Sequence, residues 1–225
     1  MRTIRTLAAG LACVALLPAV AAAQAAPQSA PNRVRSFTDS WYWGAKGGVS
    51  IFSSAAEDIT APSVGGEWMI TRTRVAMYVS VEQSFFDTQG AVSDPTSVGG
   101  ARPVDIKDAR RYNMQLFAFP KQYGAFRPYA GLGFALLAIR DAQPTGSFTS
   151  PGSQDSVFNR VNDESSRVSP VFTLGGQVDF SRFGLFVQAS TMPTQNRYLI
   201  NGKANTYLIE GGLRYNLVDA IEKLH

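Results

Sequence analysis

Residues 206–217 read TYLIEGGLRYNL and alternate between two kinds of residue. Every second residue belongs to an apolar and aromatic set: Tyr207, Ile209, Gly211, Leu213, Tyr215 and Leu217. The residues between them are mostly polar: Thr206, Leu208, Glu210, Gly212, Arg214 and Asn216. Successive side chains of a β-strand point to opposite faces of the sheet, so this pattern predicts a strand with one apolar and one mostly polar face.

Seven earlier segments alternate in the same way. They are expected as strands at residues 41–52, 62–70, 73–85, 106–119, 127–139, 168–180 and 183–192. In the first of them Trp41 and Trp43 share the apolar face, whereas Tyr42 and Lys46 lie on the other. These lengths suit tilted strands that cross a bilayer with about 9–11 residues. No segment after the N-terminal region approaches a transmembrane helix, so a membrane role has to come from strands.

The links between the expected strands alternate between short and long. Those near residues 71–72, 121–126 and 181–182 are short, whereas those at 53–61, 86–105, 140–167 and 193–203 are long and rich in Gly, Pro, Ser, Thr, Asp and Asn. Short turns on one rim and long loops on the other are typical of outer-membrane barrels. The sequence therefore predicts an all-β fold, an eight-stranded antiparallel up-and-down transmembrane β-barrel with both termini in the periplasm.

The N-terminal region supports export. Arg2 and Arg5 precede an apolar run and then Ala-rich cleavage sites, which is the pattern of a secretory signal peptide. We expect a signal peptide at 1–23, a flexible leader at 24–40, the barrel at 41–217 and a periplasmic tail at 218–225. Cys13 lies in the signal peptide, so the mature chain is expected to lack cysteine. The formal charge of +4 falls to +2 without Arg2 and Arg5, which argues against nucleic acid as a partner.

Three motifs carry a family resemblance. The opening strand WYWGAKGG (41–48), the segment RPYAGLG (127–133) and the closing GGLRY (211–215) resemble small eight-stranded outer-membrane barrels, namely the outer-membrane protein A transmembrane domain and the X-type and W-type barrels. The resemblance implies a place in the outer membrane, with its lipids as partners. It also implies insertion by the barrel-assembly machinery through the terminal-strand signal Glu210, Gly212, Tyr215 and Leu217. Family barrels commonly end on an aromatic residue, whereas residues 218–225 continue beyond Leu217 here.

The mostly polar face carries charges that we expect inside the barrel. They form a hypothetical lumen charge network of Lys46, Glu67, Glu82, Arg111, Glu210 and Arg214. Charges in a narrow lumen are costly unless they are paired. We expect ion pairs between Glu82 and Arg111 and between Lys46 and Glu210, and a lower melting temperature after Glu82→Ala. The alternatives are solvated interior charges without fixed partners, or a soluble barrel with the apolar face inward.

Three functions remain open from the sequence. A lumen of eight strands is filled by side chains, which favours a non-enzymatic structural or surface-interaction role through the long loops, chiefly 140–167; the extracellular partner is unknown. A narrow channel or carrier for small hydrophobic molecules is the alternative, if Gly131, Gly133 and Ala135 leave space rather than accommodate bulky Phe117 and Phe186. A lipid-modifying enzyme is third, because the single histidine, His225, lies in the tail. No motif indicates a cofactor or a metal.

Overall fold

The computed structural model describes residues 37–54, 57–193, 199–200 and 205–219. They form one closed barrel in which each strand pairs antiparallel with the next and β8 closes onto β1. The expected fold class and all eight strands are confirmed. The strands are β1 (Ser40–Ser53), β2 (Asp58–Arg72), β3 (Val75–Ser93), β4 (Ala101–Ala118), β5 (Phe126–Pro144), β6 (Ser166–Phe180), β7 (Phe183–Pro193) and β8 (Asn205–Asp219). The expected signal peptide and most of the leader and tail lie outside the described residues.

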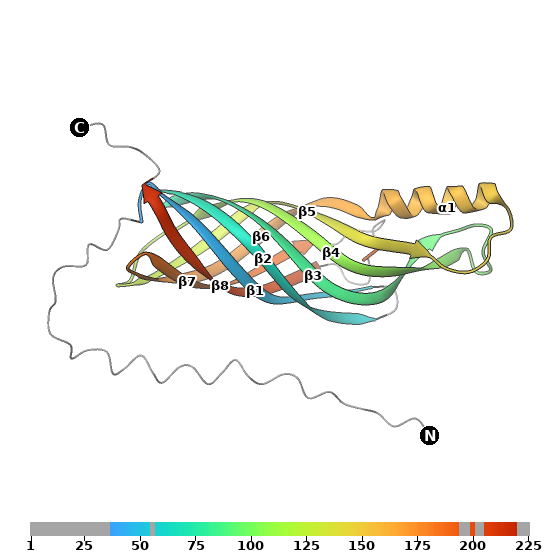
Figure 1. Cartoon of the computed structure of the whole chain (residues 1–225), viewed down its shortest axis with the longest axis horizontal. Helices are drawn as coiled ribbons and strands as arrows, with labels where there is room; N and C mark the ends of the chain where they lie inside the picture. Colours follow the sequence, from blue (N-terminus) through green and yellow to red (C-terminus); the bar gives the residue numbers. More distant parts are fainter. Residues whose placement is uncertain (1–36, 55–56, 194–198, 201–204, 220–225) are drawn as a thin grey trace, which may run out of the picture. The chain divides into compact units, whose positions relative to one another are not determined.

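The two ends of the barrel differ, as the link lengths predict. At the turn end, β2 joins β3, β4 joins β5 and β6 joins β7 through short connections, and β8 also ends there. At the loop end, three strands continue well past the others (Figure 1). These are β3, β4 and β5, with 19, 18 and 19 residues, whereas β7 has 11. The long strands therefore build a projection that the shorter strands do not share.

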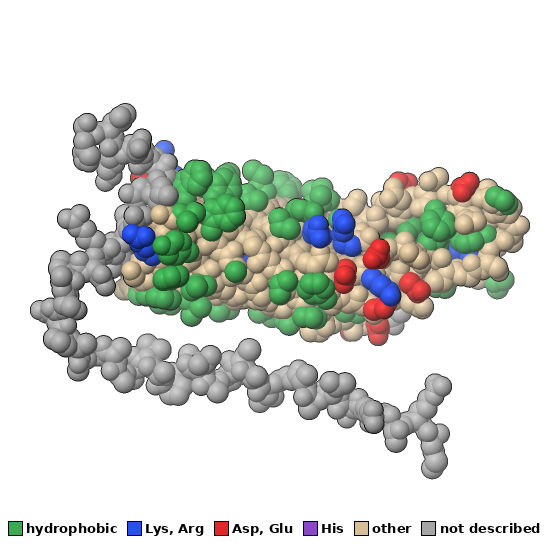
Figure 2. Space-filling model, viewed as in Figure 1, with side chains coloured by type: hydrophobic (Ala, Val, Ile, Leu, Met, Phe, Trp, Pro, Cys, Tyr) green, Lys and Arg blue, Asp and Glu red, His purple; other side chains and the backbone are tan. Residues whose placement is uncertain are grey.

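The apolar face of each strand points outward. Trp43, Met114, Leu116 and Phe134 are 58–68% exposed although they are large and apolar. Figure 2 shows such side chains covering the barrel over the part nearer the turn end, with charged side chains gathered where this belt ends. A closed barrel with an apolar outer belt leaves no unpaired strand edge in contact with lipid, as a membrane requires.

Side chains fill the lumen in three layers. An aromatic layer lies at the turn end, with Phe117 stacked between Tyr78 and Tyr129 at ring-centroid distances of 4.4 and 4.9 Å. A polar and charged layer follows. An apolar cluster closes the loop end; it includes Phe52, Leu137 and further apolar residues. The expectation that Gly131 accommodates Phe117 is confirmed, since a Cβ there would lie 2.3 Å from that ring.

The expected loops 86–105 and 140–167 contain more structure than we predicted. β3 and β4 extend as a paired hairpin to Ser93 and Ala101, and β5 continues to Pro144. The helix α1 (Pro151–Glu164) follows β5. Residues 87–107 and 140–165 together form what we call the blade, a three-stranded sheet with α1 packed against it. Within the described part of the chain, no helix is long and apolar enough to cross a membrane.

Local sequence explains α1. Ser150 caps its N-terminus and forms a reciprocal capping box with Ser153, and Pro151 occupies the first turn, where its missing N–H is harmless. Val157 and Val161, four residues apart, lie on one helical face and are both buried. These signals are present in the sequence. The helical segment is short and mostly polar, however, so its periodicity is weak beside the clear alternation of the strands on either side.

Candidate functional site

All six residues expected in the lumen charge network point into the barrel and are buried. Their exposed fractions are small: Lys46 6%, Glu67 4%, Glu82 2%, Arg111 5%, Glu210 3% and Arg214 0%. They contribute three cations and three carboxylates, so their formal charges balance. This balance reduces the cost of placing ionised groups in a water-poor interior, which is large for an unpaired charge.

Lys46 lies at the centre of the first cluster. Its Nζ donates to Glu82, to Glu210 Oε2 at 3.1 Å and to the Tyr78 hydroxyl at 2.8 Å. Arg111 Nε lies 3.6 Å from Glu82 Oε2 and donates to Asn113 Oδ1 at 3.0 Å. Both expected pairs are therefore within ion-pair distance, and neutral polar groups join them into one network.

Arg214 and Glu67 form a second cluster. The guanidinium donates to Glu67 and, through Nη1, to Gln177 Oε1 at 2.6 Å, and it lies 3.9 Å from the centre of the Phe186 ring. Glu67 in turn accepts from the Tyr78 hydroxyl at 2.9 Å, which links the two clusters. The sequence placed both charges inside the barrel without pairing them with each other.

Glycines allow charges two strands apart to meet. Gly44 on β1 pairs with Glu67 on one side and with Arg214 on the other, and a Cβ on Gly44 would lie 2.8 Å from Glu67 Cγ. Gly65 on β2 lies in the same way between Lys46 and Glu82, and its Cβ would lie 2.9 Å from Glu82 Cγ. The ion pairs Glu67–Arg214 and Lys46–Glu82 therefore each cross an intervening strand over a residue that has no side chain.

A residue of the expected leader packs into the turn end of the barrel. Phe37 is buried, packs edge-on against Phe119 at 4.7 Å, and has the Arg127 guanidinium 4.2 Å from its ring centre. Its carbonyl accepts from the Thr71 hydroxyl, which also contacts Ser40. The part of the leader that the structure describes is therefore attached to the barrel mouth.

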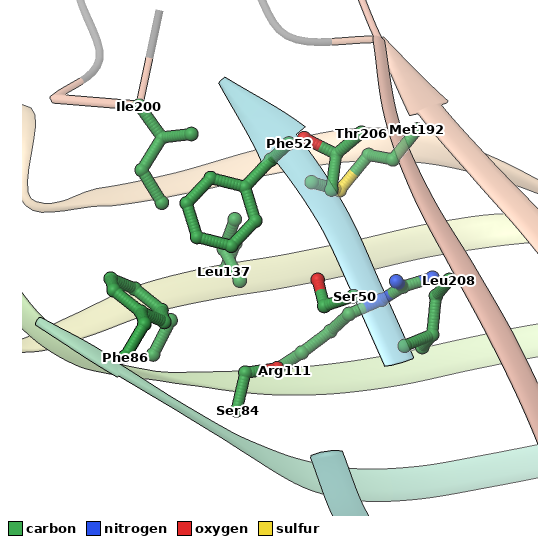
Figure 3. A pocket seen from close by; sticks show the side chains of 11 residues that line it. Ser50, Phe52, Ser84, Phe86, Arg111, Leu137, Met192, Ile200, Thr206 and Leu208 are labelled. Atoms are coloured by element: carbon green, nitrogen blue, oxygen red, sulfur yellow. The ribbon is translucent and has the colours of Figure 1, made fainter. Parts of the chain in front are cut away.

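The loop end holds an apolar pocket (Figure 3). Phe52, Phe86, Leu137 and Ile200 surround it, and Arg111 reaches it from the charged layer. Its cavity of about 10 Å³ has room for about one water molecule. Among the described residues, none forms a hydrogen bond to Arg111 Nη2. The charged layer is therefore separated from the loop end by closely packed apolar side chains.

The blade has an apolar core of its own. Val92 of β3, Val104 and Ile106 of β4, and Val157 and Val161 of α1 are each at most 4% exposed. They join the apolar cluster that closes the lumen. The core therefore continues from the barrel into the projection.

Arg102 ties the tip of the blade together. It donates through Nε to Asp94 Oδ2 at 2.6 Å and through Nη1 to the carbonyls of Thr145 and Ser147 at 3.0 and 3.2 Å. Its guanidinium also lies 4.2 Å from the centre of the Phe148 ring. The hydrogen bonds from Thr96 and from Arg102 lower the pKa of Asp94 to about 2. One buried cation thus joins the β3–β4 turn to the segment before α1.

The residues of the expected terminal-strand signal lie on both faces of β8. Glu210 points into the lumen, whereas Leu217 is 40% exposed on the outer face. Tyr215 lies on the outer side, where its ring packs 5.1 Å from that of Phe183 and its hydroxyl accepts from Arg182. Gly212 provides space for Phe186, since a Cβ there would lie 2.8 Å from that ring. Their role in insertion stays a prediction.

Comparisons with known proteins find similarity among solved structures only. No protein-family model matches the chain, and no curated protein matches it in sequence. Among solved structures, Neisserial surface protein A aligns with a TM-score of 0.52 and 9% identity over 79% of this chain and 97% of that one. The attachment invasion locus protein Ail of Yersinia pestis aligns at 0.44, with 12% identity over 79% and 99% of the two chains. OprG of Pseudomonas aeruginosa aligns at 0.42, with 12% identity over 80% and 97%. With the closed eight-stranded topology and the first of these alignments, the chain has the fold of the small eight-stranded outer-membrane β-barrels.

Proposed function

We propose that this protein is a non-enzymatic outer-membrane barrel that presents the blade at the cell surface for contact with a partner. The observation that carries the proposal is the blade itself, which projects beyond the apolar belt and has a buried core. A connector needs no such core, because a solvated loop can join two strands. Function commonly resides in surface segments that a rigid scaffold positions.

The filled lumen supports a role at the surface rather than conduction. An aromatic layer, a charge network and an apolar cluster follow one another along the barrel axis. A hydrated ion would have to displace side chains of all three layers. We therefore expect no steady single-channel conductance when the purified barrel is inserted into a planar bilayer.

Surface labelling of intact cells tests the topology. Val98, at the tip of the β3–β4 turn, is fully exposed, and Gln122 lies in the β4–β5 connection at the turn end. We expect a membrane-impermeant maleimide to label Val98→Cys on intact cells, but Gln122→Cys only after the outer membrane is permeabilised. Labelling of both, or the opposite pattern, would contradict a surface-exposed blade.

The apolar pocket at the loop end favours a second candidate, a carrier for small hydrophobic molecules. Its cavity of about 10 Å³ would have to enlarge several-fold to admit such a molecule. Uptake of a small hydrophobic solute into liposomes that contain the barrel, slowed by Leu137→Trp, would favour the carrier over the surface-interaction role.

A further inference from the structure

A second cavity, with a volume of about 270 Å³, lies at the turn end of the barrel. Gln122 of the β4–β5 connection and Arg182 of the β6–β7 connection border it, and Phe37 and Asn216 line it from the barrel. Pockets that hold small molecules begin at about 300 Å³. The cavity is therefore large enough for a small polar group, whereas the pocket at the loop end has room for little more than a water molecule.

Two arginines give this cavity a surplus of positive charge. Arg127 donates through Nε to Asp179 Oδ2 at 2.6 Å, and its terminal nitrogens have no hydrogen-bond partner among the described residues. Arg182 is exposed, donates through Nη1 to the Tyr215 hydroxyl at 3.3 Å, and has no carboxylate within ion-pair distance in the described ranges. One carboxylate thus faces two guanidinium groups, which leaves N–H donors and one positive charge for a ligand.

Asn216 adds a hydrogen-bond acceptor to the same cavity. It is 2% exposed, and its Oδ1 accepts from no group in the part of the chain that the structure describes. Its backbone N–H donates to the Arg182 carbonyl at 2.8 Å, which holds the residue beside the β6–β7 connection. A buried acceptor without a donor is unfavourable. A ligand that donates a hydrogen bond here would satisfy it.

The position of the cavity indicates the kind of anion. Phe183 lines it and is 39% exposed on the outer face, where its ring lies 5.1 Å from that of Tyr215 and 6.0 Å from that of Phe180. Exposed aromatic side chains at the end of an apolar belt mark the level of the lipid headgroups. Phosphate groups are concentrated at this level, and arginine binds a phosphate through several N–H groups at once. Charge and position together favour a phosphate over a carboxylate.

We propose that the turn-end cavity binds a phosphate group whose substituent carries a hydrogen-bond donor. The phosphate contacts the guanidinium groups of Arg127 and Arg182, and the donor satisfies Asn216 Oδ1. A glycerol phosphate group has both features, since its glycerol bears free hydroxyls. Its source is either phosphatidylglycerol in the adjoining leaflet or free glycerol phosphate. The inference goes beyond the proposed function and does not depend on what the blade contacts.

Nuclear magnetic resonance of the full chain in nanodiscs tests the site. The reference discs contain only phosphatidylcholine, whose headgroup has no hydrogen-bond donor. Adding phosphatidylglycerol to the discs, or free glycerol phosphate to the buffer, should shift the side-chain amide signal of Asn216 and the backbone signal of Gly124, which also lines the cavity. The compound that acts at the lower concentration identifies the source. No shift with either compound would overturn the site.

Two arginine variants separate the cavity from a general attraction of anions to the turn end. Arg182→Gln removes donors that face the cavity and should weaken binding about tenfold. Arg72→Gln is the matched control, because Arg72 is exposed at the end of β2, pairs with Asp39 at 3.2 Å and does not line the cavity. Equal weakening by the two substitutions would show nonspecific attraction to a positive surface and overturn the site.

Asn216→Ala tests the contact with the donor. Binding of the same two compounds, followed at the Gly124 signal, should weaken about tenfold. An unchanged barrel band in unboiled gel samples shows that this variant folds. Unchanged binding by folded Asn216→Ala would overturn the contact with Oδ1. Arg182→Gln changes an exposed connection, so its result does not depend on how well the buried Asn216 site tolerates substitution.

Discussion

Strands β3 and β4 line part of the lumen and continue into the blade, with opposite chemistry in the two regions. Around the charged layer, β3 and β4 direct polar and charged side chains such as Glu82 and Arg111 inward, and apolar ones such as Val81 and Met114 outward. In the blade they enclose Val92, Val104 and Ile106 and expose Asp87 and Lys107. The change follows the solvent, since lipid surrounds one part and water the other. On β4 this requires an adjustment of the alternation where the environment changes, whereas β3 keeps its even-numbered residues inward in both regions, such as Glu82 and Val92.

The adjustment lies at an irregularity between β3 and β4. The pairing shifts between Ser84 and Asp87 on β3, and Asp108 on β4 is skipped. Asp108 has a positive φ of 54°, an uncommon conformation that bulge residues adopt. The inward residues of β4 have odd numbers within the barrel, such as Arg111, and even numbers within the blade, such as Ile106. This bulge lets β4 present charges to the lumen and aliphatic residues to the blade core.

The largest expected effect comes from removing one partner of an ion pair in the lumen. Glu67→Leu would leave Arg214, which is fully buried, without its carboxylate. Removing one partner of a buried ion pair costs about 3–5 kcal/mol. We expect the free energy of unfolding of the barrel, measured by urea titration in lipid vesicles, to fall by about that amount.

The double variant Glu67→Leu with Arg214→Leu is the control. Replacing both charges with apolar groups removes the unpaired cation, so it should recover most of the stability. A double variant no more stable than Glu67→Leu alone would show that the loss comes from packing in this layer rather than from the uncompensated charge.

A smaller effect should come from the glycines that the ion pairs cross. Gly44→Ala would place a methyl group against Glu67 and push its carboxylate away from Arg214. Overpacking of this kind typically costs about 1–3 kcal/mol. Gly47→Ala is the matched control on the same strand, because its Cβ would make an ordinary contact at 3.6 Å. Similar unfolding curves for the two variants would contradict the role of Gly44.

The sequence predicted the barrel well because the alternation has a single physical cause within the belt. Lipid on one side and a narrow lumen on the other sort each strand into two faces, so Lys46, Glu82 and Arg214 could be placed inward from period alone. The pairing of Glu67 with Arg214 could not be predicted. This ion pair depends on the register of β2, β1 and β8, and on Gly44 of β1, which lies between the two charged residues. The alternation within a single segment shows neither.

The blade was not predicted from the sequence because its periodic patterns are interrupted or weak. The bulge at Asp108 changes the phase of the alternation, so residues 101–107 did not continue the pattern of 109–118. The capping residues Ser150 and Pro151 could have indicated α1, but a helix with only two buried valines gives a weak periodic signal. The blade core also assembles residues from β3, β4, β5 and α1, which no local pattern brings together.

A smaller effect, confined to the blade, is expected from a substitution in the blade core. Val161→Ala removes two methyl groups from the blade core and should destabilise α1 by about 1–2 kcal/mol. We expect faster protease cleavage within 140–165, while the detergent-resistant barrel band on a gel stays unchanged. Asn159→Ala, on the exposed face of α1, is the control. Loss of the barrel band in Val161→Ala would mean that blade and barrel unfold as one unit.

The smallest effect concerns pH at the tip of the blade. Hydrogen bonds from Thr96 and Arg102 hold the pKa of Asp94 at about 2, below the ordinary value of about 3.9. A lowered pKa means that the ionised carboxylate stabilises the folded tip above the ordinary value, and that this contribution is lost as the pH falls from about 4 to about 2. Amide exchange at residues 94–102 should therefore accelerate, relative to its intrinsic pH dependence, only in that acid range. Asp94→Asn should exchange faster at neutral pH and lose this acid response. An acid response that persists in Asp94→Asn would assign the titration to another group, and the tip would then owe its order to the apolar core alone.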